Sequence, residues 1–93
     1  MLTDADMLQG EITLKEVIDS IFNSLEKKLL DRKEITLDFQ RVTFISVYFL
    51  ERLEKFVSRA KDLNVKVQIK NVQSNIYKVF QVAKVKDILN YCN

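Results

Sequence analysis

The sequence contains no histidine and a single cysteine, Cys92, which stands second from the end. Without imidazole or a second thiol, we expect no histidine-based catalysis, no zinc site of histidine and cysteine, and no internal disulfide. Nothing near Cys92 supplies an activating base, so the sequence favours a packed or frayed helix-end thiol over a reactive nucleophile. We therefore assign no catalytic residue and no metal ligand, and expect a protein that is not an enzyme.

Glycine is equally scarce, because Gly10 is the only one. A glycine-rich phosphate loop of the mononucleotide or dinucleotide type is therefore excluded, and we expect no cofactor. Apolar runs of the roughly 18–20 residues that a membrane helix needs are also missing. The acidic start, Met-Leu-Thr-Asp-Ala-Asp, has neither a basic segment nor an apolar signal core, so we expect a cytoplasmic protein that is not inserted in a membrane.

The composition is otherwise that of a globular protein. Hydrophobic residues make up 47% of the 93, which predicts one folded domain over residues 1–93 with a poorly defined N-terminal segment at 1–12. The net charge is only +2 and no aromatic-rich RNA-binding motif is present, so we expect no nucleic-acid partner. Residues 1–34 hold 5 Lys/Arg against 8 Asp/Glu and residues 35–93 hold 10 against 5, and this asymmetry favours an oriented contact.

The first half of the sequence predicts one helix and one strand. A helix over 14–30 follows Thr13-Leu14-Lys15-Glu16, which has the pattern of a capping box with Thr13 as the N-cap. Apolar residues then recur at spacings of three and four, so the helix has one wide apolar face. A strand over Ile35–Phe39 alternates apolar and polar residues. Segments near 5–9 and at 42–45 are weaker strand candidates, because neither alternates clearly.

The second half begins with a helix whose N-cap is Ser46, because the residues that follow have an apolar period near 3.6. Asn64 is a plausible left-handed helix end, and Val65–Ile69 alternates as a second strand. Ser74 opens a third helix, and a short final helix follows a break near Lys84. Because a helix joins the two strands, they must be parallel. We predict a small α/β layer fold, with helices packed on a short, mostly parallel sheet.

The passage from strand to helix carries a family resemblance. It reads Leu37-Asp38-Phe39, then Phe44-Ile45-Ser46-Val47-Tyr48-Phe49-Leu50. This resembles the STAS superfamily, the sulfate-transporter and anti-sigma-factor-antagonist domain, over about residues 13–91. A closer likeness is to the STAS-like domain family of unknown function, whose pattern is met by Asp38, Phe39, Val42, Ile45, Ser46, Phe49 and Leu53. The resemblance implies a STAS-like fold and a regulatory module that binds another protein.

The sequence departs from the classical antagonists where they are regulated. They carry aspartate at the position of Ser46 and a phosphorylatable serine at the position of Val47. The resemblance therefore implies partner binding without the usual phosphoacceptor, because valine takes no phosphate. Ser46 is either an alternative phosphoacceptor or, as we expect, only a helix cap. Asp38, at the end of the predicted strand, is either a hydrogen-bonding residue or a ligand-binding or catalytic group.

The helix that begins at Ser46 is the predicted partner-binding element. Tyr48, Arg52, Lys55 and Arg59 recur at i, i+4, i+7 and i+11, which predicts one stripe opposite the apolar seam. This stripe is either a solvated basic face or a docking surface for an acidic partner or a phosphate group. The predicted partner-binding residues are Ser46, Val47, Tyr48, Arg52, Lys55 and Arg59.

The resemblance implies three classes of protein partner: an anti-sigma-factor kinase, a larger signalling assembly, or a transporter ATPase of the lipid-trafficking kind, with the chain as the STAS subunit of a transport complex. The alternative function is a nucleotide- or lipid-binding domain that uses Asp38 and the helix N-terminus at Ser46. We also predict a homodimer that buries the N-terminal strand edge and part of the first helix. Lys66 and Lys70 discourage pairing at the other edge, and the N-terminal segment has no such protection.

Overall fold

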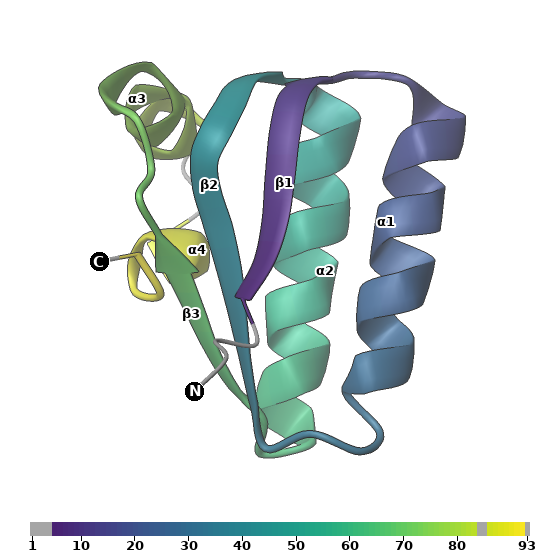
Figure 1. Ribbon diagram of the computed structural model, residues 1–93. Coiled ribbons are helices and arrows are strands. Elements are labelled where there is room, and N and C mark those ends of the chain that lie inside the picture. Colours follow the sequence, from purple (N-terminus) through teal and green to yellow (C-terminus); the bar gives the residue numbers. More distant parts are fainter. Residues whose placement is uncertain (1–4, 84–85, 93) are drawn as a thin grey trace.

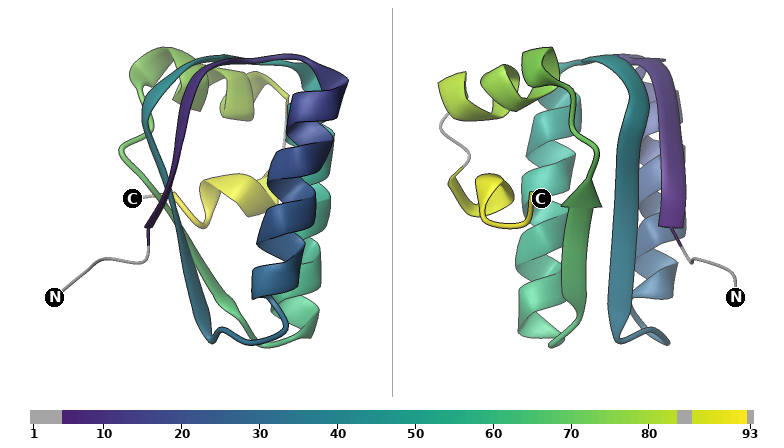
Figure 2. Two further views of the ribbon diagram at one scale, coloured as in Figure 1. Left: turned by 45° about the vertical axis from the view of Figure 1, so that its right-hand side comes forward. Right: turned by 60° about the vertical axis from the view of Figure 1, so that its left-hand side comes forward.

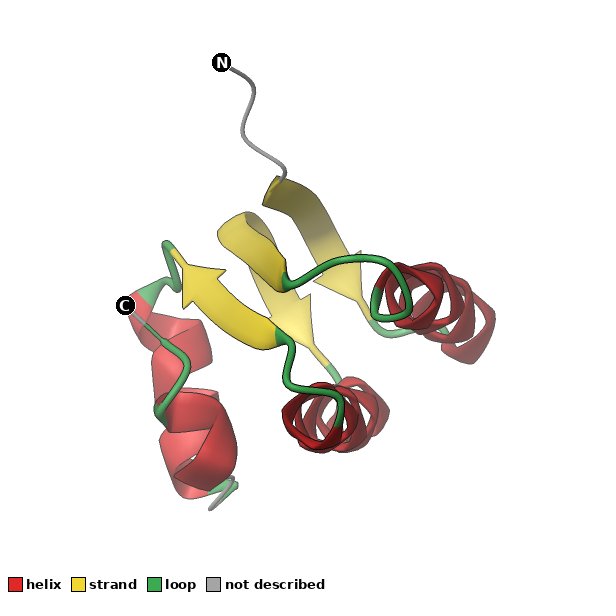
Figure 3. Cartoon of the chain, turned by 90° about the horizontal axis from the view of Figure 1, so that it is seen from below, coloured by secondary structure: helices red, strands yellow, loops and turns green. Residues whose placement is uncertain are grey.

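The structure of the protein is a computed structural model that describes residues 5–83 and 86–92. Its elements are β1 (Ala5–Ile12), α1 (Lys15–Lys28), β2 (Glu34–Ile45), α2 (Val47–Asp62), β3 (Lys66–Lys70), α3 (Ser74–Val82) and α4 (Lys86–Leu89). The strands form a parallel sheet in the order β1-β2-β3 (Figure 1). Seen along the strands, the helices lie on the same side of the sheet (Figure 3). The predicted α/β layer fold is confirmed.

The N-terminal segment forms a complete strand that is longer than the candidate at 5–9. Leu8 and Ile12 are buried beneath the helices. Gly10, which lies between these two residues, has a φ of +80°. Asp6, two residues before Leu8, accepts a hydrogen bond through its carboxylate from the Lys28 ammonium of α1. A glycine and an ion-paired aspartate thus share the inward side with the apolar residues. Their presence explains why the sequence of β1 does not alternate clearly.

The predicted strand at 35–39 and the weaker candidate at 42–45 are one strand. The buried side chains of β2 are Ile35, Leu37, Phe39, Val42 and Ile45, so their spacing changes from two to three after Phe39. The register against β1 shifts opposite Met7–Gln9 and again opposite Gly10–Glu11, and each shift accommodates one extra residue of β2. These two bulges keep the apolar side chains on the helix side, and they break the period of two that a regular strand shows.

The helix ends follow local sequence signals only in part. The Ser46 hydroxyl oxygen accepts a hydrogen bond from the Phe49 backbone N–H at 3.2 Å, so the predicted cap is confirmed. The prediction that Thr13 caps the first helix is wrong. The chain remains extended after β1, and Leu14 is the N-cap without a side-chain cap bond. Asn64 has the predicted left-handed φ of 60°. The break expected near Lys84 lies outside the described residues.

The core lies between the sheet and the helices. Its largest fully buried side chains include five phenylalanines, which are Phe22, Phe39, Phe49, Phe56 and Phe80. Phe39 of the central strand makes edge-to-face contacts with Phe49 of α2 and Phe80 of α3, with ring centroids 6.0 and 6.1 Å away. Phe39 therefore links both helical flanks to the sheet.

On the β3 side of β2, side-chain amides donate hydrogen bonds to the β2 carbonyls beyond the last residue paired with β3. β3 pairs with β2 only as far as Lys70, which is opposite Asp38. Beyond that point the Gln73 amide donates to the Gln40 carbonyl at 2.7 Å, and the Asn75 amide donates to the Thr43 carbonyl at 3.3 Å. These bonds anchor the start of α3 to the bulged half of β2. Figure 2 shows α4 beside β3 and α2, and α3 beyond the end of β3.

Candidate partner-binding site

The parallel topology collects three helix starts at one end of the molecule, at the top of Figure 1. Three large apolar side chains at this end are exposed: Leu14 at the N-cap of α1 by 63%, Phe44 near the end of β2 by 53%, and Val47 at the start of α2 by 71%. We call these three residues the strand-end surface. The first turn of α2 carries no acidic residue. This end therefore offers apolar contact area beside a helix N-terminus.

Ser46 is engaged in the local structure of this end. Its backbone N–H donates to the Ile12 carbonyl at 3.3 Å, and its side chain caps α2 through Phe49. The side chain is only partly exposed. The geometry is that of a helix cap, and phosphorylation of Ser46 stays a prediction that no contact here tests.

Tyr48 and Arg52 turn toward α1 instead of lining an exposed stripe. The Tyr48 hydroxyl donates to Asp19 Oδ1 at 2.5 Å, and the Arg52 guanidinium donates to the same oxygen. Arg52 Nη2 also lies 3.9 Å from Glu26 Oε2, and the Arg52 side chain is only 16% exposed. The prediction of a single exposed stripe is therefore wrong at these two residues, because acidic residues on α1 hold them between the helices.

Asp19 is the centre of this arrangement and was missed in the sequence. Lys15 adds a third donor, with its Nζ 3.1 Å from Asp19 Oδ2. The hydrogen bonds from Tyr48 and Lys15 lower the pKa of the Asp19 carboxyl below its ordinary value. We call Lys15, Asp19, Glu26, Tyr48 and Arg52 the Asp19 cluster. It fixes the position of α2 relative to α1.

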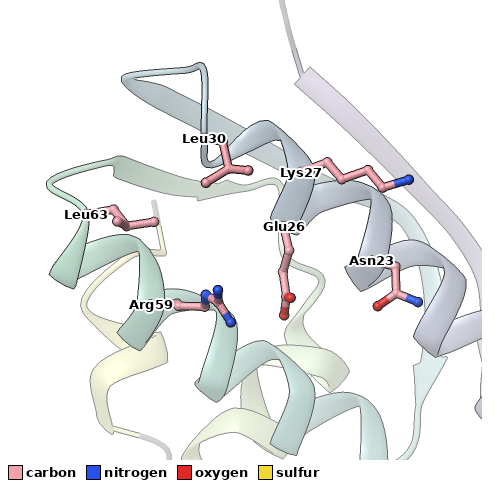
Figure 4. A pocket seen from close by; sticks show the side chains of 6 residues that line it. All are labelled: Asn23, Glu26, Lys27, Leu30, Arg59 and Leu63. Atoms are coloured by element: carbon pink, nitrogen blue, oxygen red, sulfur yellow. The ribbon is translucent and has the colours of Figure 1, made fainter.

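The other two residues of the predicted stripe, Lys55 and Arg59, are exposed. Arg59 borders a hollow of about 380 Å³ between α1 and α2, which is also lined by Asn23, Glu26, Lys27, Leu30 and Leu63 (Figure 4). Arg59 is twelve positions after Val47 on the helix, or roughly 18 Å along the axis. The six predicted residues therefore do not form one surface. Ser46 and Val47 lie at the strand ends, Tyr48 and Arg52 face α1, and Lys55 and Arg59 lie farther along α2.

Asp38 lies within β2 and not at its end, because the strand continues to Ile45. Its Oδ1 accepts hydrogen bonds from the Gln40 backbone N–H at 2.9 Å and from the Asn71 side-chain amide at 3.3 Å. The first bond satisfies a backbone donor at the bulge that follows Phe39. These contacts favour the hydrogen-bonding interpretation of Asp38. In residues 5–83 and 86–92, no group of three or more His, Cys, Asp or Glu is placed to hold a metal ion.

Cys92 lies beside β3, with a bridge to Ile69 and its Sγ 3.5 Å from the Ile88 carbonyl oxygen. Burial raises the pKa of this thiol to about 11. The thiol is therefore protonated near neutral pH, which favours the packed interpretation over a reactive nucleophile. Within the described ranges, no helix is long and apolar enough to cross a membrane.

Comparisons with known proteins agree with this architecture. Residues 7–93 match the family model of the STAS domain. The chain is similar to the anti-sigma factor antagonist SpoIIAA in its unphosphorylated form, with a TM-score of 0.80, 15% identity, and coverage of 100% of this chain and 82% of that one. It is also similar to the Bacillus cell fate determinant SpoIIAA in the phosphorylated form, with a TM-score of 0.76, 15% identity, and coverage of 100% and 85%. A search of the curated proteins found no significant match. Because the family model spans nearly all of the chain, this protein belongs to the STAS domain family.

Proposed function

We propose that this protein is a non-enzymatic, cytoplasmic regulatory module, similar to the anti-sigma factor antagonists, that binds another protein through the strand-end surface. The observation that carries the proposal is the exposure of Val47, at 71%, in the first turn of α2. Exposed apolar side chains grouped at one end of a small domain are typical of interaction sites. Leu14 and Phe44 extend this apolar area along the same end.

The position of Val47 also bears on regulation. By resemblance, it corresponds to the phosphoacceptor serine of the classical antagonists. A phosphate there would add roughly −1.5 to −2 charges next to a helix N-terminus. An isopropyl group takes no phosphate, so the proposed contact is apolar and is not switched at this residue. The partner classes remain an anti-sigma-factor kinase, a signalling assembly, and a transporter ATPase.

The alternative, a nucleotide- or lipid-binding domain, has less support. It relies on Asp38 and the start of α2, and the polar groups there already have partners within the fold. Asp38 Oδ1 bonds to Gln40 and Asn71, and the Ser46 hydroxyl bonds to Phe49. A ligand would have to displace these bonds or compete with them. The exposed apolar groups, in contrast, are free to enter a protein interface.

The test compares Val47→Asp with the wild type in a pull-down from the native cytoplasm, followed by titration of each purified chain with the recovered partner. We expect Val47→Asp to weaken binding at least tenfold, because a carboxylate replaces an apolar contact and stays hydrated. Val82→Asp is the matched control, since Val82 is 81% exposed on α3. Equal affinity of Val47→Asp and the wild type would refute the proposed surface. A ligand-dependent rise in melting temperature with nucleotides or fatty acids would support the alternative.

A further inference from the structure

The two edges of the sheet differ in how far they are protected. β3 has only five residues, with Lys66 and Lys70 at its ends, and its Ile69 N–H donates to the Tyr91 carbonyl at 2.8 Å. The C-terminal segment thus occupies part of that edge. β1 has eight residues and contains no lysine or proline. Among the described residues no strand pairs with its outer edge, so its outward N–H and C=O groups are available to another strand.

Apolar side chains lie on both sides of the β1 edge. Met7, which is 48% exposed, lies on the face of the sheet away from the helices. On the helix side, Val17 and Ile21 belong to a stripe of α1 that continues to Lys28, at i, i+4 and i+11. The bond from Lys28 to Asp6 places this stripe next to β1. Val17 is 46% exposed and Ile21 is half-buried, so this flank adds apolar area to the open edge.

We propose that β1 pairs in antiparallel fashion with β1 of a second copy of this chain, about a two-fold axis near Leu8. The two sheets then form one continuous six-stranded sheet, and the α1 helices lie antiparallel across the axis. Met7 of one copy is opposite Gln9 of the other, and no like charges face each other at the centre. The remaining outer edges are those of the two β3 strands, which carry the lysines, so the assembly closes at two copies.

Charge complementarity favours a second copy as the occupant of this edge. The first turn of α1 contains the acidic Glu16, and its last turn contains Lys27 and Lys28. Lys15, also in the first turn, is paired with Asp19, and Lys28 is paired with Asp6, so Glu16 and Lys27 are the charges left for a second copy. Antiparallel α1 helices bring Glu16 of each copy toward the end of α1 that carries Lys27 in the other. The helix dipoles add to this attraction, because the positive end of one helix approaches the negative end of the other. Asp6, the charged residue on the inward side of β1, is already neutralised by Lys28.

Val47 and Phe44 of the strand-end surface stay free in this dimer, because they belong to α2 and β2 while the new interface runs along β1 and α1. One dimer would therefore present two copies of the proposed partner site. The dimer does not depend on the proposed function, since the β1 edge and the α1 flank are separate from Val47 and Phe44. The two proposals can fail independently of each other.

The experiment is sedimentation equilibrium of the full chain from about 1 to 300 μM, a range that includes the micromolar dissociation constants of weak dimers. We expect a monomer–dimer equilibrium. Met7→Lys/Gln9→Lys places lysines opposite one another across the axis and should weaken the dimer at least tenfold. Both substituted side chains are exposed, so the fold is retained, which circular dichroism checks. Gln40→Lys/Thr43→Lys adds the same charge at exposed positions of β2, away from the edge, and should leave the dimer unchanged.

Hydrogen exchange provides a second readout that does not depend on any variant. On dilution from about 300 to 1 μM, protection of the β1 amides should fall while that of the β3 amides stays constant. A chain that remains monomeric at 300 μM would overturn the proposal. Equal dimer affinity of the β1 lysine variant and the wild type, or loss of the dimer in both lysine variants alike, would also overturn it.

Discussion

The two flanks of α2 are held by different chemistry. On one flank α1 and α2 are joined by Phe22 against Phe49 and Phe56 and, in addition, by the Asp19 cluster, whose central carboxylate receives three polar donors. On the other flank α3 is joined to β2 by Phe80 against Phe39 and by uncharged amides that donate to strand carbonyls. Charged hydrogen bonds respond to pH and salt, whereas aromatic and amide contacts respond little. One helix layer therefore has a titratable side and a non-titratable side.

The largest effect is expected at Phe39, whose ring packs against Phe49 of α2 and Phe80 of α3. Phe39→Ala removes a fully buried ring and should lower the free energy of unfolding by about 3–5 kcal/mol. Urea denaturation followed by circular dichroism measures this loss. Phe44→Ala is the control on the same strand, because Phe44 is 53% exposed, and it should cost less than about 0.5 kcal/mol. Similar losses in both variants would show that the ring of Phe39 does not hold α2 and α3 against the sheet.

The hydroxyl of Tyr48 tests the charged flank alone. Tyr48→Phe keeps the ring and removes the donor to Asp19, so we expect the unfolding free energy to fall by about 1.5 kcal/mol, the lower end of the roughly 1.5–3 kcal/mol typical of hydrogen bonds to charged groups, because this bond is only partly buried. Tyr77→Phe on α3 is the matched control, since Tyr77 is 38% exposed, and it should change stability very little. A Tyr48→Phe variant as stable as the wild type would show that the Asp19 cluster does not stabilise the packing of α1 against α2.

The free energy that the Asp19 carboxylate contributes to folding should decrease as the pH falls, and this pH dependence should distinguish the α1 flank from the α3 flank. The folded-state pKa of Asp19 lies below its unfolded value, so the stabilisation is present above that unfolded value, near 4, and is lost as the pH falls through the lowered folded pKa. The wild type should therefore exceed Asp19→Asn in stability at pH 6, and the two should converge toward pH 2. Urea titrations at several pH values measure this difference. A difference that is independent of pH would contradict the assigned role of the carboxylate.

The smallest effect is expected at the amides of the α3 flank. Gln73→Ala removes an exposed donor to the Gln40 carbonyl, and water can replace it, so we expect a loss of about 0.5 kcal/mol or less. The loss in unfolding free energy should be the same at pH 4 and pH 7 and at low and high salt. Urea denaturation at both pH values, each at low and high salt, measures this. A marked salt dependence would mean that the non-titratable flank is coupled to the charged one.

Local signals in the sequence predicted the parts of this fold that depend on neighbouring residues. Ser46 as a cap, Asn64 as a left-handed helix end, and the period of α2 follow from residues within a few positions. The partner of Tyr48 is Asp19, which is 29 positions away, and helical spacing alone could not indicate that Arg52 turns toward α1. The helical spacing of the predicted stripe, Tyr48, Arg52, Lys55 and Arg59, is therefore correct, but the predicted exposure of Tyr48 and Arg52 is wrong.

The length of β2 was underestimated for a physical reason. A period of two is the signature of a regular strand, and each bulge replaces it with a spacing of three. The spacing of Phe39, Val42 and Ile45 does not alternate, so the strand was predicted to end at Phe39 and 42–45 was only a weaker candidate. The exposure of Val47 was easier to anticipate, because the first turn of a helix at the end of a parallel strand lies at the rim of the sheet.

The bulges of β2 also set how this strand tolerates changes in length. Two exposed residues, Gln40 and Arg41, separate the buried Phe39 and Val42, and deletion of one would restore an ordinary spacing of two. Both apolar side chains would still point inward, while the residues after the deletion would shift by about 3.3 Å toward the start of the strand. Ser46 and Val47 would then lie closer to the middle of β1. Related chains that are one residue shorter or longer at this point of β2 would keep the same core residues, and the start of α2 would be shifted along the strand direction relative to β1.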